Sequence, residues 1–235
     1  MGKVNWNDTP TNNSSSGNGK LPFLKFEAGK DYIIRPIRDP HEIIQYFNRV
    51  NGQARNAVTD VEGSKCVIQS YKDENGKPRF KQVKRYLVNC ILRDDGELYI
   101  ANLPSTVFFQ MSEWARENEC NPGHPKEGAD FKIKVEKTGD KAINVKYHCI
   151  PLKSRPLSEA EVKHIKEIGG LFNFEEIPIF QPVPQDKIEV ALGLKEEDEG
   201  NDSGNASASA PFDEDVSFDD NTDKAAVVDD DDIDF

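Results

Sequence analysis

Short apolar runs separated by glycine, proline and acidic residues mark where the patterned part of the chain begins. The runs LPFLKF, DYIIRPI and IIQYFNRV lie between Leu21 and Val50. Apolar runs of this length, with turn residues between them, are typical of strands in a small β-barrel or β-sandwich. Residues 66–68 are a candidate for one further strand.

Two longer stretches have the pattern of β-hairpins. In residues 80–102, an apolar run at 86–92 is followed by the turn DDG at 94–96 and by a second apolar run. In residues 129–150, apolar and polar residues alternate on both sides of the turn TGD at 138–140. Because alternation puts one face of a strand on the core and the other in solvent, Lys132, Lys134 and Lys146 are expected on the outer face of the second hairpin.

Two segments have helical spacing instead. Val107, Met111 and Trp114 form one stripe within residues 105–116, which places Trp114 in the core. Ser158 and Glu161 form a capping box ahead of a second apolar stripe. The proline-rich stretch at 172–185 is expected to run extended over the surface, because proline cannot donate to a central strand.

The charge is distributed unevenly along the 235 residues. The formal net charge is −12, but residues 196–235 hold 16 acidic residues and one lysine, which leaves 29 basic and 26 acidic residues in the rest. A mildly basic body with an acidic tail is common in nucleic-acid binders. Composition predicts a disordered segment at 1–20, one core domain at 21–194 and a disordered acidic tail at 195–235.

Several classes of function have no signal in the chain. No apolar run is long enough to span a membrane, and the N-terminus has no secretory signal. No catalytic or nucleotide-binding fingerprint is present, which predicts that the protein is not an enzyme. Cys120 and His124 have a spacing that permits zinc, but no CxxC accompanies them, and the alternative is an ordinary loop. We therefore expect no metal and no cofactor.

Aromatic and cationic residues share the first strand of the 80–102 hairpin and the loop before it. If Phe80, Lys84 and Tyr86 point to one face, that face offers rings for bases beside charge for phosphates, as in sequence-tolerant single-strand binders. The loop at 70–80 is either a clamp or a solvated connector, and the outer lysines of the second hairpin either follow a phosphate backbone or only aid solubility. The candidate DNA-binding residues are Tyr46, Arg49, Tyr71, Lys72, Lys77, Arg79, Phe80, Lys81, Lys84, Arg85, Tyr86, Tyr99, Lys132, Lys134 and Lys146.

In the order of its elements, the chain resembles the single-stranded DNA-binding proteins of T-even and related phages. The resemblance rests on KRYLVNCILRDDGELY at 84–99, the helix after it, EGADFKIKVEKTGDKAINVKYH at 127–148 and the acidic C-terminus. The resemblance covers about residues 21–160. It implies a mainly β fold, an OB-fold-like five-stranded barrel with additional strands, two short helices and disordered tails, whose cleft binds single-stranded DNA. Tyr86 matches the Tyr of that family's Tyr-x-x-Asn strand.

The sequence also departs from that family in two places. The family's Cys/His zinc site has no counterpart here, since Cys66 has no partner cysteines or histidines nearby. The basic N-terminal segment that promotes cooperative polymerisation is matched only by Lys3 and Lys20.

The resemblance implies a protein that coats single-stranded DNA during replication, recombination and repair. The expected location is the cytoplasm, which is that of the host cell if a phage encodes the protein. Its acidic tail is expected to compete with DNA and to recruit replication and recombination proteins. The candidate partner-binding residues are Asp229, Asp230, Asp231, Asp232, Ile233, Asp234 and Phe235. The alternatives are a scaffold protein that works through its tail without binding nucleic acid, and a tail that only keeps the protein soluble.

Overall fold

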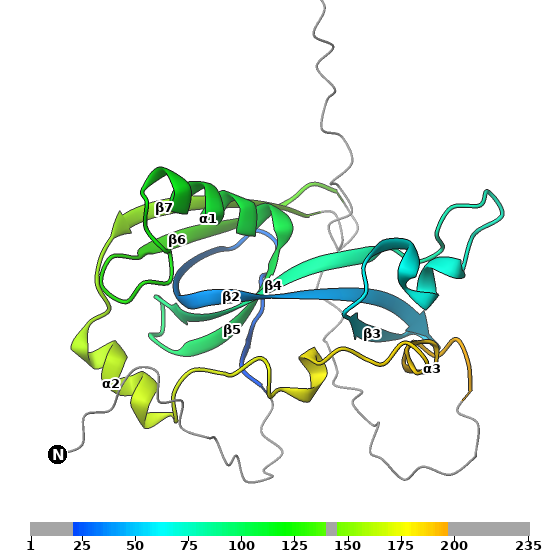
Figure 1. The fold of residues 1–235 in the computed structure, drawn as a ribbon. Helices are drawn as coiled ribbons and strands as arrows, with labels where there is room; N and C mark the ends of the chain where they lie inside the picture. Colours follow the sequence, from blue (N-terminus) through cyan, green and yellow to red (C-terminus); the bar gives the residue numbers. More distant parts are fainter. Residues whose placement is uncertain (1–20, 140–144, 197–235) are drawn as a thin grey trace, which may run out of the picture.

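The computed structural model describes residues 21–139 and 145–196, which form a mainly β fold (Figure 1). Six strands of one seven-stranded sheet follow the order β1-β5-β4-β2-β6-β7, and β3 pairs with β2. The strands are β1 (Phe23–Leu24), β2 (Asp31–Val50), β3 (Gln53–Thr59), β4 (Gln82–Leu92), β5 (Leu98–Pro104), β6 (Ala129–Lys137) and β7 (Val145–Ser154). The α-helices are α1 (Ser105–Glu117), α2 (Glu159–Glu167) and α3 (Ile188–Ala191).

The longest strand, β2, contains two of the predicted runs. The sequence predicts separate strands for DYIIRPI and IIQYFNRV, whereas the structure joins them in one strand of 20 residues. The ladder between β2 and β4 shifts register between Ile37 and His41, and Arg38 has a positive φ of 64° there. This irregularity is a β-bulge, which allows a strand to bend and continue. The Asp39-Pro40 turn signal therefore marks a bend and not the end of a strand.

The largest hydrophobic core lies between α1 and the sheet. The predicted stripe of Val107, Met111 and Trp114 is buried there together with Phe131 and Ile133. β4 pairs antiparallel with β5, and β6 pairs antiparallel with β7. The helix, its buried stripe and both hairpins are thus confirmed.

A second lobe, which we call the arm, consists of the far halves of β2 and β4 with β3, residues 60–81 and α3 (Figure 1). Its core contains Tyr46, Ile68, Phe80, Ile188 and Leu192. The strand expected at residues 66–68 is absent, because this segment forms 3₁₀ turns at Gly63–Lys65 and Val67–Ser70. β3 was not predicted, since QARNAVT has only a weak apolar pattern.

The proline-rich stretch forms no strand and runs over the surface, as predicted, but two of its rings point inward. Phe174 and Phe180 are buried against the sheet face opposite α1, in one cluster with Ile43 and Leu87. The side-chain amide of Asn89 holds this stretch, since its Nδ2 donates to the carbonyl of Phe172 at 3.0 Å and its Oδ1 accepts from the same residue's N–H at 3.0 Å. Burial of two phenylalanine rings outweighs the extended preference of the prolines.

A group of charged side chains ties α2 to the sheet. The Arg93 guanidinium donates to Asp130 at 2.6 and 3.0 Å and pairs with Glu161, while Arg155 pairs with the same Asp130. Ser158 and Glu161 form the predicted capping box, which is confirmed. Burial alone would raise the pKa of Glu161, but its hydrogen bonds with Ser158 and the nearby guanidinium groups lower it overall.

Within the described ranges, no helix combines the length and the apolar character needed to cross a membrane. The segments predicted to be disordered, 1–20 and nearly all of 195–235, lie outside the described residues.

Candidate nucleic-acid interface

Three of the five rings predicted to stack on bases lie in hydrophobic cores. Tyr46 is fully buried, and Phe80 and Tyr86 are 6% and 5% exposed. The Tyr46 hydroxyl accepts a hydrogen bond from Gln69 at 2.8 Å, and burial raises the pKa of Tyr46 to about 12. These rings stabilise the fold, so Tyr86→Ala is expected to cost about 3–5 kcal/mol of stability. Alanine at Phe80 or Tyr86 is therefore expected to destabilise the fold, and neither ring is accessible to a base.

The expectation that Phe80, Lys84 and Tyr86 share one face is also wrong. β4 begins at Gln82, and Phe80 precedes it and packs in the arm with Tyr46 and Ile68. Tyr86 belongs to the core beneath α1, where its ring stacks on Phe108 with centroids 3.7 Å apart and planes 9° from parallel. A loop residue does not follow the period of two that governs the strand after it.

The two remaining tyrosines are half-buried and bonded to carboxylates. The Tyr71 hydroxyl donates to Glu189 at 2.7 Å, and the Tyr99 hydroxyl donates to Asp95 at 2.8 Å. These hydrogen bonds raise the pKa of both tyrosines. Each ring is thereby held at one orientation on the surface.

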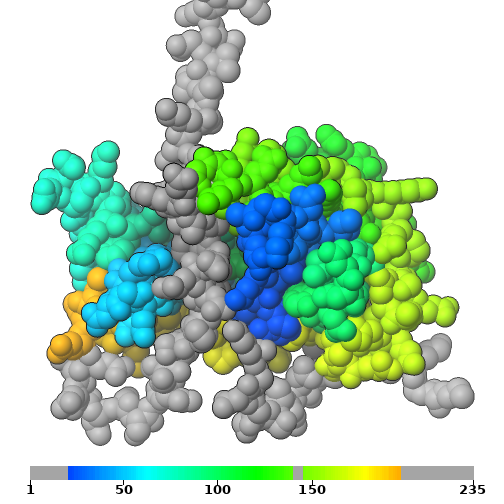
Figure 2. Space-filling model, turned by 180° about the vertical axis from the view of Figure 1, so that it is seen from behind, coloured from blue at the N-terminus to red at the C-terminus, as the bar shows by residue number. Residues whose placement is uncertain are grey.

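Four of the predicted cations lie on one projecting segment, residues 71–81, which we call the finger (Figures 1 and 2). Lys72 pairs with Pro78 in an isolated bridge, and the Asp73 carboxylate accepts from the N–H groups of Asn75 and Lys77 at 2.9 Å each. These bonds fix a turn within the finger. The exposed cations of the finger are Lys72, Lys77, Arg79 and Lys81.

Lys84 lies where the arm meets α1. Its ammonium pairs with Glu62 of the arm and with Glu42 of β2 at 3.5 Å, and its carbonyl accepts from the Ser105 hydroxyl at 3.2 Å. The hydrogen bond to Glu62 is the main cause of a raised pKa for Lys84. We call this group the Lys84 junction. Its two carboxylates exceed its single cation, so a phosphate at Lys84 must displace at least one of them.

The other predicted cations differ in their surroundings. Arg85 is only 3% exposed, so the structure contradicts its prediction as a direct phosphate contact. Lys132 pairs with Asp31 at 2.6 Å. Lys134 faces His148 across the β6–β7 ladder, and Lys146 is exposed on β7. Arg49 is exposed near the end of β2.

Two rings on the first turns of α1 are not among the residues predicted from the sequence. Phe108 is half-buried on Tyr86, and Phe109 is 60% exposed, with its centroid 5.8 Å from that of Phe108. A signal was present, because Phe109 lies off the stripe of Val107, Met111 and Trp114. A phenylalanine outside the buried stripe of an amphipathic helix is expected on the surface.

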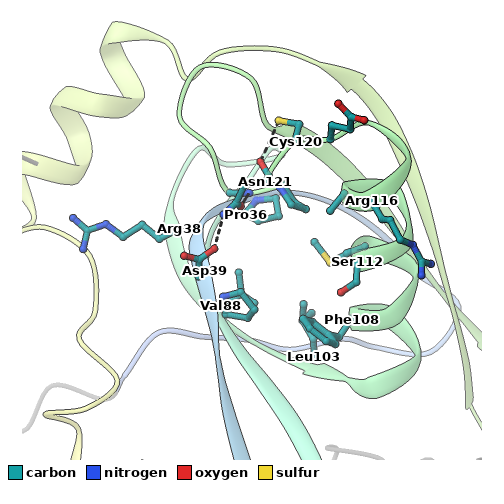
Figure 3. Close-up of a pocket in the computed structure, with 16 residues that line it drawn as sticks. Pro36, Arg38, Asp39, Val88, Leu103, Phe108, Ser112, Arg116, Cys120 and Asn121 are labelled. Carbon is teal, nitrogen blue, oxygen red and sulfur yellow. Dashed lines mark hydrogen bonds between the residues drawn. The ribbon is translucent and has the colours of Figure 1, made fainter. Parts of the chain in front are cut away.

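A cavity of about 570 Å³ lies between α1 and the bulge of β2 (Figure 3). Its wall is mainly apolar and includes Val88, Leu103, Phe108 and Met111, whereas the guanidinium groups of Arg38 and Arg116 point away from its centre (Figure 3). The lining therefore offers apolar contact and few groups for hydrogen bonding.

Opposite α1, the cavity wall is fixed by contacts between the bulge of β2 and residues 121–123. The Arg38 N–H donates to the carbonyl of Gly123 at 3.0 Å, and Asn121 donates to the Asp39 carboxylate. A Cβ at Gly123 would lie 2.1 Å from the Arg38 carbonyl oxygen, so only glycine permits this approach.

No metal centre is formed by the described residues, in which no three His, Cys, Asp or Glu side chains are grouped to bind an ion. Cys120 donates to the carbonyl of Asn121 at 3.5 Å, and the Nδ1 of His124 accepts from the N–H of Glu127 at 3.1 Å. Both groups thus take part in local loop contacts.

The candidate partner-binding residues, from Asp229 to Phe235, lie outside the described residues. The chain matches no known protein-family model and no curated protein sequence.

Proposed function

We propose that this protein binds single-stranded DNA without sequence preference during replication, recombination and repair, through an OB-fold-like core. Support comes from the strand connectivity. β5, β4, β2, β6 and β7 lie side by side in that order, and α1 connects β5 to β6. OB-folds are partly open five-stranded Greek-key barrels that bind oligonucleotides with the connections between strands 1 and 2 and between strands 4 and 5.

The observation that carries the proposal is the position of the finger. If β2 and β4 are the first two strands of such a barrel, residues 51–81 are the connection between them, and the finger is part of it. Its four exposed cations, Lys72, Lys77, Arg79 and Lys81, outnumber its two acidic residues, Asp73 and Glu74. Clustered cations on a projecting loop bind phosphates through release of counterions.

The test is a titration of fluorescently labelled oligonucleotides with the full chain. Fluorescence anisotropy reports binding, and the titration is repeated at several salt concentrations. We expect similar affinity for different single-stranded sequences, weaker binding to duplex, and a linear fall of log affinity with log salt. Absence of binding at low salt would contradict the proposal and favour a scaffold role for the acidic tail.

A matched pair of variants tests the finger itself. Removing three cations by K72A, K77A and R79A should flatten the salt slope by about 2, since each contact to single strands contributes about 0.7. The control removes three exposed lysines elsewhere, at Lys126, Lys163 and Lys166. Equal slopes in the two triple variants would place the interface away from the finger.

A further inference from the structure

Phe109 is the most exposed large apolar side chain in the described part of the chain, at 60%, ahead of Ile168 at 45% and Ile150 at 42%. The apolar stripe of α1 packs without it. Because a phenylalanine contributes to stability mainly through burial, this ring adds little to the fold in its present position.

The ring is nevertheless held in place from below. Tyr86 is buried and stacks on Phe108, and Phe108 lies against Phe109 with an angle of 54° between the two planes. The three rings form a continuous series from the core to the surface, which we call the aromatic series. Tyr86 anchors it to β4, so the outermost ring rests on a rigid support.

Two hydrogen bonds fix the helix on either side of Phe109. Ser105 bonds to the backbone of Lys84 on β4, and Gln110 accepts from the N–H of Cys149 on β7 at 2.7 Å. One bond leads to β4 and the other leads to β7, so the helix is fixed to both strands. An exposed ring that is held in position before binding has the features of a base-stacking residue in a single-strand binder.

We propose that Phe109 stacks on an unpaired base of bound single-stranded DNA, with Phe108 and Tyr86 supporting its ring. This inference rests on the proposed function and adds the contact that the buried tyrosines do not provide. The rings of Tyr86 and Phe80 would require unfolding of their cores to reach a base, whereas Phe109 is accessible in the folded protein.

The experiment compares F109A, F109L and F109W with the wild-type full chain in the same anisotropy titration. Loss of one stacked base weakens binding by about 5- to 150-fold. We therefore expect the affinity of F109A for the oligonucleotide to be lower than that of the wild type by a factor in this range. F109L should bind as weakly as F109A, because leucine keeps apolar bulk but has no π-face. I168A is the control, since it removes the next most exposed apolar side chain, at the end of α2; it should bind as wild type does.

F109W provides a direct signal. It should retain binding, and its added indole fluorescence should be quenched by the oligonucleotide beyond any change from Trp6 and Trp114 in the wild type. Thermal melts should be unchanged for all four variants.

The outcomes separate the two proposals. If the wild type binds and F109A binds within about twofold of it, the stacking role is wrong while the proposed function stands. Wild-type affinity in F109L would mean apolar contact without stacking and would also overturn the inference. If the wild type binds no oligonucleotide, the proposed function fails, and the role of Phe109 fails with it; the exposed ring would then fit a protein partner.

Discussion

Replacing Glu62 by glutamine should make Lys84 available to a phosphate. In the folded protein, the Lys84 ammonium is shared between Glu62 and Glu42, and all three side chains are about half exposed. Glutamine keeps the size of the side chain and its capacity for hydrogen bonds, but it removes one negative charge. Lys84 is then balanced by Glu42 alone at 3.5 Å, and the E42Q/E62Q double variant frees it fully.

The magnitude follows from counterion release. One additional phosphate contact steepens the slope of log affinity against log salt by about 0.7 for single strands. The ratio of variant to wild-type affinity should therefore be about fivefold larger at 0.1 M salt than at 1 M. The double variant should show this change in anisotropy titrations across that range. E167Q is the control, because Glu167 is paired with Lys163 on the exposed surface of α2.

The comparison with E167Q separates a local effect from a change in net charge. If E62Q and E167Q, each of which removes one negative charge, give the same slope, Lys84 does not meet the nucleic acid, and the junction only connects the arm to α1. A gain in affinity that persists undiminished at 1 M salt would likewise refute the electrostatic reasoning, since exposed charges are screened there.

Three further predictions concern stability and the tail. R93M leaves the Asp130 and Glu161 carboxylates without their main partner and should cost about 3 kcal/mol in urea unfolding, whereas R155M, at a 53% exposed side chain, should cost less than about 1 kcal/mol. The pKa of Glu161 is lower in the folded protein than in the unfolded chain, so its ionised form stabilises the fold. This stabilisation is complete above the unfolded pKa of about 4.3 and is lost as pH falls through the folded value. In E161Q, the urea midpoint should therefore fall less below about pH 5 than it does in the wild type. Deleting residues 196–235, which carry 16 acidic residues, should tighten DNA binding at low salt. Deleting only Ile233 to Phe235 should leave DNA binding unchanged and abolish the pull-down of replication proteins. If both deletion variants behave as the wild type in both assays, the tail only keeps the protein soluble.

Local patterns predicted the elements whose partners are close in sequence. Two apolar runs around a turn predicted the first hairpin, and alternation predicted the second. The spacing of Val107, Met111 and Trp114 predicted α1, and Ser158 with Glu161 predicted the start of α2. Each of these depends on residues within a few positions of one another, so a periodicity is sufficient to identify it.

The misplaced site residues depend on contacts between distant parts of the chain. Phe80 is buried because Ile188 and Leu192, more than 100 residues later, complete the core of the arm. No local pattern reports such a contact. Arg85 illustrates a related limit, since its charge suggests solvent while its place in the sheet buries it. Phe109, by contrast, could have been identified from its position off the helical stripe.

The distribution of the cores along the chain has a consequence for synthesis. Tyr147 is the last buried residue of the core beneath α1, so all buried residues of that core are outside the ribosome once Tyr147 has emerged. The sheet face opposite α1 must wait for Phe174 and Phe180, and the arm must wait for Ile188 and Leu192. Domains fold as their residues emerge, and unpaired apolar surface on nascent chains is prone to aggregation. The arm, with its finger, is therefore the last part to become native, and until then its half of β2 has apolar residues exposed to chaperones.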